Sequence, residues 1–409
     1  MQGKNKPLAR FLEKNINKLI TSGYSAFILG PRQVGKTTLI KQCLGKLNRT
    51  IEYPLQNPAV RLELETNPAK IINQIEAIKY QPYVFIDEAQ KIPEILDAVQ
   101  YLIDNKKAKF ILTGSSARKL RRKGVNLLPG RVKRFYLDPL SWGELGYSKN
   151  CFIKELLTTN INHVSSYSFE DSLVYGSLPG IINLPKKDRI EFLNSYAQIY
   201  LEEEIRAEAL SRKIGAFSRF LELAAIESSS SPNLANLSQQ SGVSQPAIKE
   251  FYHLLEDTLI IERVDPYRKN ARKRIFSSPR YYFFDIGVRN SLARLPLTSG
   301  LVNAQKGVLF EHAVVLEIIK RIRLINKNYK LYFWRTLAGA EVDCVVDLGD
   351  RLIPIEIKSG PMVFQSELKG LKIFLEDYKN LADLGYVITF GGKKERLAEN
   401  IFAIPWDQF

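Results

Sequence analysis

Apolar positions in the N-terminal part of the chain form short uninterrupted runs, separated by stretches with helical spacing. Such a run is typical of a strand buried on both faces of a parallel sheet, whereas apolar residues recurring every three or four positions are typical of a helix with one buried face. The predicted strands are residues 25–29, 51–55, 83–88, 109–113 and 135–140. The predicted helices are residues 8–20, 38–44, 68–79 and 93–103. This alternation predicts an α/β fold around a parallel sheet.

The pattern changes after residue 145. Residues 172–180 and 187–209 predict helices without an intervening strand, which suits a helical lid, and the serine-rich residues 228–232 predict a hinge. The later predicted elements are strand 280–285, helix 307–323 and strands 331–335, 341–346 and 352–358. We therefore divide the chain into residues 1–145, 146–227, 228–275 and 276–409.

Composition narrows the class of protein. The chain has 409 residues, 45% hydrophobic and 25% charged, as expected of a globular protein with about two or three domains. A formal net charge of +16 favours a polyanionic partner, nucleic acid before an anionic membrane, although solvated lysine faces give the same excess. The sequence has neither the apolar run of a membrane span nor a signal-peptide pattern at its N-terminus, so we expect a cytoplasmic protein.

Cysteine and histidine placement argues against a disulfide framework and against structural zinc. These residues are scattered without metal-binding spacing. They are Cys43, Cys151, Cys344, His163, His253 and His312. Any metal is therefore expected to be a hard ion bound by carboxylates and phosphates.

The stretch 30–37 is a complete phosphate-binding loop with the spacing G-x-x-x-x-G-K-T, between a predicted strand and a predicted helix. Glycine lets such a loop curl so that its N–H groups point at a phosphate, and the helix adds the positive end of its dipole. Lys36 can reach the β- and γ-phosphates, and the Thr37 hydroxyl can hold Mg²⁺. The predicted ATP-binding residues of the loop are Gly30, Pro31, Arg32, Gln33, Val34, Gly35, Lys36, Thr37 and Thr38.

The strand of residues 83–88 ends in two acids, Asp87 and Glu88. Acids at a strand end emerge at the sheet edge where the phosphate-binding loop also lies. We therefore predict that Asp87 binds Mg²⁺ and that Glu88 polarises the attacking water, with Lys36 as the other catalytic residue. Strand 51–55 intervenes between the P-loop strand and this one. The paired acids are typical of ATPases with an added central strand.

Two further residues are candidates for contact with the nucleotide. Ser115 follows strand 109–113, where a small polar group can sense the γ-phosphate; Ser115 or Ser116 can also simply cap a helix beginning at Ala117. Arg131 can act as an arginine finger on the nucleotide of a neighbouring copy in a homo-oligomer, or lie on a solvated face. It belongs to a basic cluster of Lys119, Arg121, Arg122, Lys123, Arg131, Lys133 and Arg134.

With these motifs in place, the sequence resembles a known family. The segments GPRQVGKTTL, FIDEAQKIPEIL, LTGSS and GRVKRFYLDPLSWGEL are similar to those of AAA+-like P-loop ATPases common in bacteria and archaea. In that family the ATPase is joined to a C-terminal domain of unknown function with a restriction-endonuclease-like α/β core. The resemblance implies a cytosolic ATP-binding protein with a P-loop sheet of the AAA+ type, and it leaves the biological role open.

Residues 228–275 predict a winged helix-turn-helix. Gly242 supplies the tight turn, and Ser244 caps a second helix with Pro246 in its first turn. This recognition helix would present Gln245, Lys249 and Glu250 to DNA. The basic residues predicted to contact phosphates are Arg268, Lys269, Arg272, Lys273 and Arg274. Winged helices also serve as protein-interaction or lid modules, so direct DNA contact is one of two possibilities.

The C-terminal segment carries acids on a helix and on two strands. Glu356 and Lys358 are two apart on a strand, so both project to one face. With Glu311 and Asp343 they reproduce a restriction-endonuclease-like D…E-x-K arrangement. Glu311, Asp343 and Glu356 are predicted ligands of Mg²⁺ or Mn²⁺, and Asp343, Glu356 and Lys358 are predicted catalytic residues for phosphodiester cleavage. Glu341 is a spare ligand. The pattern can also arise by chance or survive in a site that no longer cuts.

Two functions follow from these motifs. In the first, ATP binding and hydrolysis gate a DNA-directed, metal-dependent nuclease domain. In the second, the protein is a nucleotide-gated switch that binds DNA or a protein partner, and its nuclease-like domain is a platform that does not cleave.

Overall fold

The computed structural model describes residues 7–116, 128–148, 153–156, 158, 160–162, 166–207, 214–269, 278–325 and 328–409, without the side chains of residues 200–207 and 214. The chain divides into an N-terminal unit, Met1–Pro139 with Leu254–Ile260, and a C-terminal unit, Leu140–His253 with Ile261–Phe409. This division is coarser than the four predicted segments. Predicted features outside the described residues are the helix from Ala117 and the residues Lys119, Arg121, Arg122, Lys123, Cys151, His163, Arg272, Lys273 and Arg274.

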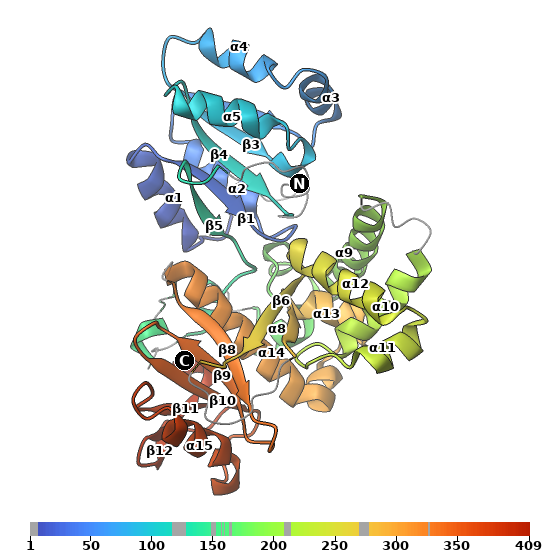
Figure 1. Ribbon diagram of the computed structural model, residues 1–409, viewed down its shortest axis with the longest axis vertical. Helices are drawn as coiled ribbons and strands as arrows, with labels where there is room; N and C mark the ends of the chain where they lie inside the picture. Colours follow the sequence, from blue (N-terminus) through green and yellow to red (C-terminus); the bar gives the residue numbers. More distant parts are fainter. Residues whose placement is uncertain are drawn as a thin grey trace. The chain divides into compact units, whose positions relative to one another are not determined.

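The N-terminal unit is built on a five-stranded parallel sheet in the order β2-β3-β4-β1-β5 (Figure 1). The strands are β1 (Ser25–Leu29), β2 (Thr50–Pro54), β3 (Tyr83–Asp87), β4 (Lys109–Gly114) and β5 (Val132–Tyr136). The strand between the P-loop strand β1 and the acid-bearing β3 is β4, while β2 lies at the edge. The expectation that residues 51–55 would intervene is therefore wrong for the sheet, because parallel strands are joined by crossovers that let chain order and sheet order differ.

The α-helices described between residues 7 and 116 are α1 (Leu12–Thr21), α2 (Lys36–Leu44), α3 (Pro58–Thr66), α4 (Lys70–Glu76) and α5 (Ile95–Asp104). The pair Asn57–Pro58 starts α3, which the hydrophobic pattern did not predict. The Asn57 side chain accepts a hydrogen bond from the Ala59 backbone N–H at 3.0 Å, and Pro58 fills the first turn. Both residue types are favoured at a helix N-terminus, so the local chemistry marks a beginning rather than an interruption.

The C-terminal unit contains an eight-stranded mixed sheet in the order β12-β13-β11-β10-β9-β8-β6-β7. The strands are β6 (Ile261–Pro266), β7 (Arg280–Phe283), β8 (Lys330–Arg335), β9 (Glu341–Asp347), β10 (Leu352–Lys358), β11 (Gly385–Thr389), β12 (Glu395–Ala398) and β13 (Ile401–Pro405). The strands β6 and β7, which follow the predicted recognition helix, form an antiparallel pair, and β6 also joins β8. The strand β6, which follows the predicted recognition helix, is therefore part of the same sheet as the predicted nuclease-like strands.

The helices described for the C-terminal unit are α7 (Trp142–Leu145), α8 (Phe169–Tyr175), α9 (Lys186–Ala207), α10 (Ile214–Ile226), α11 (Leu234–Ser241), α12 (Gln245–Asp257), α13 (Ile286–Leu292), α14 (Ser299–Ile325) and α15 (Lys369–Asp377). The last turn of α12, from Leu254, groups with the N-terminal unit. The backbone of α14 leaves helical geometry at Gln305 (φ −129°), just before the predicted helix 307–323. No helix in the described ranges has the length and apolar character needed to cross a membrane.

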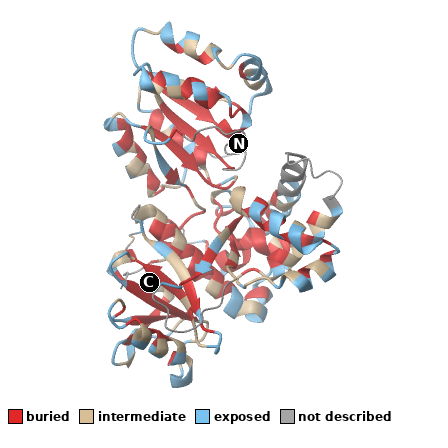
Figure 2. Cartoon of the chain, viewed as in Figure 1, coloured by how far each residue is buried: buried red, intermediate tan, exposed pale blue. Residues whose placement is uncertain are grey.

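Buried residues are concentrated in the central strands of both sheets (Figure 2). In the N-terminal unit, Phe27, Ile86 and Leu112 from three neighbouring strands belong to one apolar cluster with side chains of α5. In the C-terminal unit, Trp334 and Val345 pack in a second cluster with Phe374 of α15. These cores fix the strands whose ends carry the candidate chemistry.

Candidate functional site

The phosphate-binding loop follows β1, and its backbone requires glycine at two points. A Cβ atom on Gly30 would lie 2.2 Å from the carbonyl oxygen of Leu137, so no side chain fits there. Gly35 has φ 93°, in the left-handed region that favours glycine. Lys36 and Thr37 then begin α2. Of the other predicted loop residues, Pro31 and Val34 are buried, Arg32 is half-buried, and Gln33 and Thr38 are exposed.

Lys36 points back into its own loop. Its Nζ donates hydrogen bonds of 2.8 Å to the carbonyl oxygens of Gly30 and Pro31, and it lies 3.9 Å from Glu88 Oε1. Burial lowers the pKa of Lys36 to about 8, although Glu88 and Asp87 raise it. A phosphate offers this lysine a stronger acceptor than the two carbonyls that it binds here.

Asp87 lies at the end of β3 among neutral donors. The Thr37 hydroxyl donates to its Oδ1 at 2.9 Å and its Oδ2 at 3.0 Å, and the Thr113 hydroxyl donates to Oδ1 at 2.6 Å. Gln56 Nε2 adds a hydrogen bond to Oδ2 at 3.3 Å. A threonine hydroxyl beside a carboxylate is a set of hard oxygen donors that fits Mg²⁺. The structure thus brings together the two residues predicted to bind this ion.

Glu88 is held in place by a second group of donors. Its backbone is in the left-handed region (φ 60°), and its N–H donates to Thr113 Oγ1 at 3.0 Å. Its Oε2 accepts hydrogen bonds from Gln90 Nε2 and, at 3.0 Å, from Ser115 Oγ. Burial raises the pKa of Glu88, but Lys36 and these two hydrogen bonds outweigh that effect and lower it overall. The carboxylate is therefore charged and oriented, as a group that polarises water requires.

Sequence analysis missed several residues of this site. Gln90, in the 3₁₀-helix Ala89–Lys91, bridges Glu88 and Ser115, with 2.9 Å between Gln90 Nε2 and Ser115 Oγ. The Thr113 hydroxyl donates to the Asp87 carboxylate and accepts a hydrogen bond from the backbone N–H of Glu88. Its position as a polar residue near the end of an otherwise apolar strand was the sequence signal that could have identified it. Arg10 donates to the carbonyl oxygen of Val34 at 2.7 Å and to that of Asp138 at 2.6 Å, which ties the loop to the segment after β5.

Arg131 forms an ion pair with a residue of its own chain. Its Nε and Nη2 donate to the two carboxylate oxygens of Asp104 at 2.6 and 2.9 Å. Hydrogen bonding to Arg131 lowers the pKa of Asp104. The predicted role on a neighbouring nucleotide would require this pair to open, and it stays a prediction.

The predicted nuclease-like residues lie close together in the C-terminal unit. Lys358 Nζ is 2.8 Å from Glu356 Oε1, and the Ile357 N–H donates to Asp343 Oδ2 at 2.9 Å. Glu311, from α14, accepts a hydrogen bond at 3.1 Å from the hydroxyl of Tyr282. Burial and the charge of Asp343 raise the pKa of Glu311 to about 7 and that of Glu356 to about 8. We call these four predicted residues, together with Glu341, the carboxylate cluster.

A guanidinium that sequence analysis did not single out lies in this cluster. Arg280, the first residue of β7, hydrogen-bonds Glu341, and its Nη1 is 3.8 Å from both Glu311 Oε1 and Asp343 Oδ1. Within the described ranges, no group of three acidic, histidine or cysteine side chains is placed to hold a metal ion. The predicted ligands Glu311, Asp343 and Glu356 are neighbours, and their role in binding a metal ion stays a prediction.

The helix-turn-helix segment has the expected local geometry. Gly242, between α11 and α12, has φ 69°, in the left-handed region. Gln245, Lys249 and Glu250 are exposed on α12. Lys269 is also exposed, and its Nζ lies 3.2 Å from Asp347 Oδ2. The helix therefore presents a mixed polar face to solvent.

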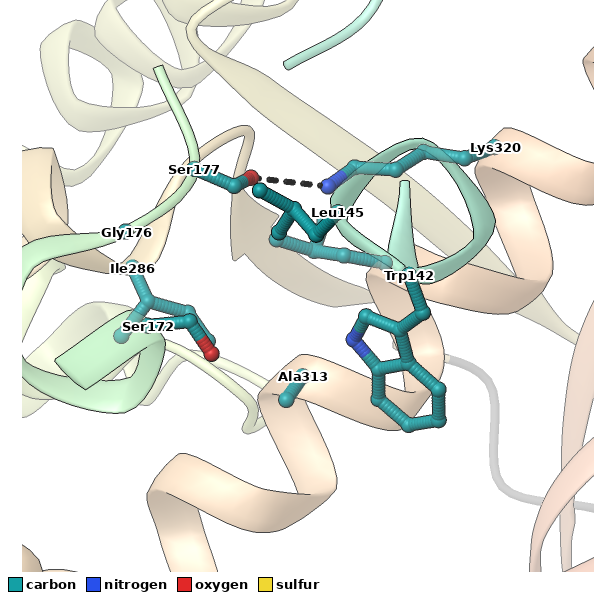
Figure 3. Close-up of a pocket in the computed structure, with 9 residues that line it drawn as sticks. Trp142, Leu145, Ser172, Gly176, Ser177, Ile286, Ala313 and Lys320 are labelled. Carbon is teal, nitrogen blue, oxygen red and sulfur yellow. Dashed lines mark hydrogen bonds between the residues drawn. The ribbon is translucent and has the colours of Figure 1, made fainter. Parts of the chain in front are cut away.

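A small pocket in the C-terminal unit is lined in part by a hydrogen-bonded lysine. Its lining residues are Trp142, Leu145, Ser172, Gly176, Ser177, Ile286, Ala313, Leu316 and Lys320. The Lys320 ammonium points across it and donates to Ser177 Oγ at 3.1 Å and to the Leu140 carbonyl oxygen at 3.0 Å (Figure 3). The Lys320 ammonium thus links α14 to the segments that carry Leu140 and Ser177.

Family models match three segments of the chain. Residues 23–146 match the family model described as an AAA domain. Residues 166–299 and 306–409 match two domains of unknown function, DUF8612 and DUF4143. The uncharacterized proteins Rv2008c of Mycobacterium tuberculosis and Mb2031c of Mycobacterium bovis are each 26% identical over 387 residues, which span 93% of this chain and 80% of theirs.

Solved structures overlap more loosely. The Walker-type ATPase PABY2304 of Pyrococcus abyssi is 16% identical and covers 71% of this chain and 99% of its own, with a TM-score of 0.48. The replication initiator DnaA, bound to AMPPCP and single-stranded DNA, is 15% identical and covers 62% and 89%, with a TM-score of 0.31. At these scores neither structure is a guide to function. Residues 23–146 are thus similar to AAA domains and carry a phosphate-binding loop, and the two segments that follow match domains of unknown function.

Proposed function

We propose that the protein hydrolyses ATP at the site between the phosphate-binding loop and the end of β3. The observation that carries this proposal is the arrangement of two acids around one P-loop: Asp87 beside the Thr37 hydroxyl, and Glu88 beside Lys36. Bound Mg²⁺ would neutralise phosphate charge. Thr37 and Asp87 are the residues that would hold it.

The other steps belong to the chain itself. Lys36 exchanges its two carbonyl acceptors for the phosphates. The backbone N–H groups of the loop and the start of α2 favour the same negative charge. Glu88, fixed by Gln90 and Ser115, orients the attacking water and takes up its proton.

Substitutions separate binding from hydrolysis. Lys36→Ala should abolish ATP binding measured by calorimetry. Glu88→Gln should retain ATP binding but lower the rate of phosphate release at least about 100-fold. Glu52→Gln, at an exposed position of β2, is the matched control and should leave both unchanged. Normal turnover by the Glu88→Gln protein would show that this residue is not the base.

We further propose that ATP state controls nucleic-acid binding by the C-terminal unit, with α11 and α12 acting as a winged helix. The exposed α12 residues Gln245 and Lys249 and the net charge of +16 support this assignment. Lys249→Ala should weaken duplex DNA binding and reduce its salt dependence between about 50 and 200 mM salt, measured by filter binding with and without ATP. Binding that ignores both salt and Lys249 would instead favour a protein partner for this helix.

A second candidate output is metal-dependent DNA cleavage in a restriction-endonuclease-like domain. The observation that favours it is the 2.8 Å pair of Glu356 and Lys358 next to Asp343. Wild-type protein and the Lys358→Ala variant should be incubated with DNA, ATP and Mg²⁺ or Mn²⁺. Cleavage by the wild type alone would support this output, whereas equal cleavage by both would exclude these residues from it.

An oligomer would be needed if Arg131 acts on a neighbouring nucleotide. Arg131→Ala should then lower hydrolysis, and light scattering should detect an ATP-dependent rise in mass. A monomer with full Arg131→Ala activity would leave this residue as the partner of Asp104 alone.

A further inference from the structure

Arg280 is placed where a metal ion would be expected. It is buried, and its Nη1 is equally distant from Glu311 Oε1 and Asp343 Oδ1, at 3.8 Å from each. Those two residues are predicted metal ligands. The other guanidinium nitrogen, Nη2, hydrogen-bonds Glu341, the predicted spare ligand. One cation of the chain thus approaches three of the four acids in the carboxylate cluster.

The position of this guanidinium is fixed from several sides. Arg280 pairs with Val264 in the β6–β7 ladder, and its guanidinium carbon lies 4.6 Å from the centre of the Phe333 ring. Tyr282, two residues on and therefore on the same face of β7, donates to the same Glu311 oxygen that Arg280 approaches. Moving Arg280 away would leave three half-buried carboxylates close together without their counter-ion, which is unfavourable.

A guanidinium at this position disfavours a divalent ion at the same carboxylates. Mg²⁺ requires oxygen ligands at about 2.0–2.1 Å in octahedral geometry, and a second cation between the same carboxylates would repel it. Among the acidic, histidine and cysteine side chains of the described residues, no group of three is arranged to hold a metal. The Glu356 Oε2 atom is buried and makes no hydrogen bond, so one acceptor of the cluster is left over.

We infer that Arg280 is the resident cation of the carboxylate cluster and keeps divalent metal out of it. The cluster then serves as an ion-pair core that joins β7, α14 and β9, and the C-terminal unit engages its partner without cutting it. This inference bears on the second candidate output and does not depend on ATP hydrolysis.

The test measures Mn²⁺ binding by the full-length protein in the absence of nucleotide. Electron paramagnetic resonance reports the concentration of free Mn²⁺. Arg280→Gln should gain a site at least about tenfold tighter than any in the wild type, and the Arg280→Gln/Glu356→Gln double variant should lose it. Arg335→Gln is the matched control, because Arg335 also pairs with Glu341, at 3.4 Å, but is exposed. It should bind Mn²⁺ as the wild type does.

A folded Arg280→Gln protein without the new site would overturn the inference. If that variant does not fold, the wild type decides the matter. Equal Mn²⁺ binding by wild type and Glu356→Gln supports a closed cluster, whereas weaker binding by Glu356→Gln shows that metal already enters. ATP hydrolysis measured on the same samples tests the nucleotide site separately, so failure of one proposal is distinguishable from failure of the other.

Discussion

The nucleotide site and the carboxylate cluster both bury acids near a lysine, but they satisfy those acids differently. Asp87 and Glu88 accept hydrogen bonds from hydroxyl and amide groups, and Lys36 is bound chiefly to carbonyl oxygens of its own loop. In the cluster, the acids face the guanidinium of Arg280 and the ammonium of Lys358. Neutral donors orient an acid and leave its charge available, whereas a bound guanidinium cancels it.

This difference sets what each site can accept. The nucleotide site keeps negative charge for a metal and positive charge for phosphates in separate places, so both can be engaged together. In the cluster, cations of the chain already face the acids, and burial together with the charge of Asp343 raises the pKa values of Glu311 and Glu356. Similar residue types thus give one site that is ready for a ligand and one that is internally closed.

The largest contrast is expected from the same acid-to-amide change made in both sites. Asp87→Asn should lower Mg²⁺-dependent ATP hydrolysis at least about 100-fold, because the amide removes the charge that would hold the ion. Asp343→Asn should leave the hydrolysis rate within about twofold of wild type, because it belongs to the other site. Phosphate release over a range of Mg²⁺ concentrations measures both. A large loss in Asp343→Asn would break the separation between the two sites.

The closed cluster should also make stability depend on pH. With pKa values of about 7 and 8, Glu311 and Glu356 keep protons in the folded chain that the unfolded chain has already lost. Stability should therefore fall as the pH rises from about 4.5 to about 8, by at most about 1.4 kcal/mol per pH unit for each proton.

Glu356→Gln should flatten this dependence and raise the free energy of unfolding near pH 9 by about 2 kcal/mol relative to wild type. Urea unfolding near pH 5, 7 and 9 measures it, and Glu376→Gln, at an exposed position of α15, is the control. Parallel pH profiles for wild type and Glu356→Gln would mean that the cluster does not penalise its charged form.

The donors around Glu88 should matter for turnover more than for binding. Gln90→Ala should lower kcat about tenfold with little change in KM for ATP, because Gln90 orients Glu88 and lies outside the phosphate-binding loop. Lys91→Ala, the exposed neighbour, serves as control. A rise in KM at unchanged kcat would instead place Gln90 among the groups that bind nucleotide.

The smallest effect concerns the proton on Lys36. Its pKa of about 8 in the free protein should rise when phosphates replace the carbonyl oxygens, so ATP binding takes up a proton. ATP affinity should therefore weaken about threefold from pH 7.5 to pH 8.5. Calorimetry in buffers of different ionisation enthalpy detects the uptake. Affinity that does not vary with pH would indicate that this lysine is already charged throughout.

Much of the fold follows from periodicity, but order in the sheet does not. The strands 25–29 and 83–88 were predicted within a residue of β1 and β3, because apolar runs bounded by polar residues are strong local signals. The position of β4 between them depends on crossover packing, which local sequence does not encode. Helix α3 is missing from the predicted helices, because the residue types of Asn57–Pro58 at its start are also found at breaks between elements.

The same limit applies to the sites. Gly30, Lys36 and Thr37 were predictable because one short loop fixes their spacing, and Asp87 with Glu88 because they end a strand. Thr113 and Gln90 act across segments about 25 residues apart, and their partners are defined only once the sheet has formed. Arg280 belongs to no motif in the sequence, so its role was not predictable. It approaches acids on α14 and β9 only because β7 carries it there.

The division of the chain into two units has a consequence for where the chain can be truncated. Because Leu254–Ile260 groups with the N-terminal unit, the chain passes between units after Pro139, after His253 and after Ile260. A fragment ending at Pro139 would lose a segment whose Leu259 packs on the core of that unit. A fragment that contains the whole N-terminal unit therefore has to include Leu254–Ile260 as well as the residues up to Pro139.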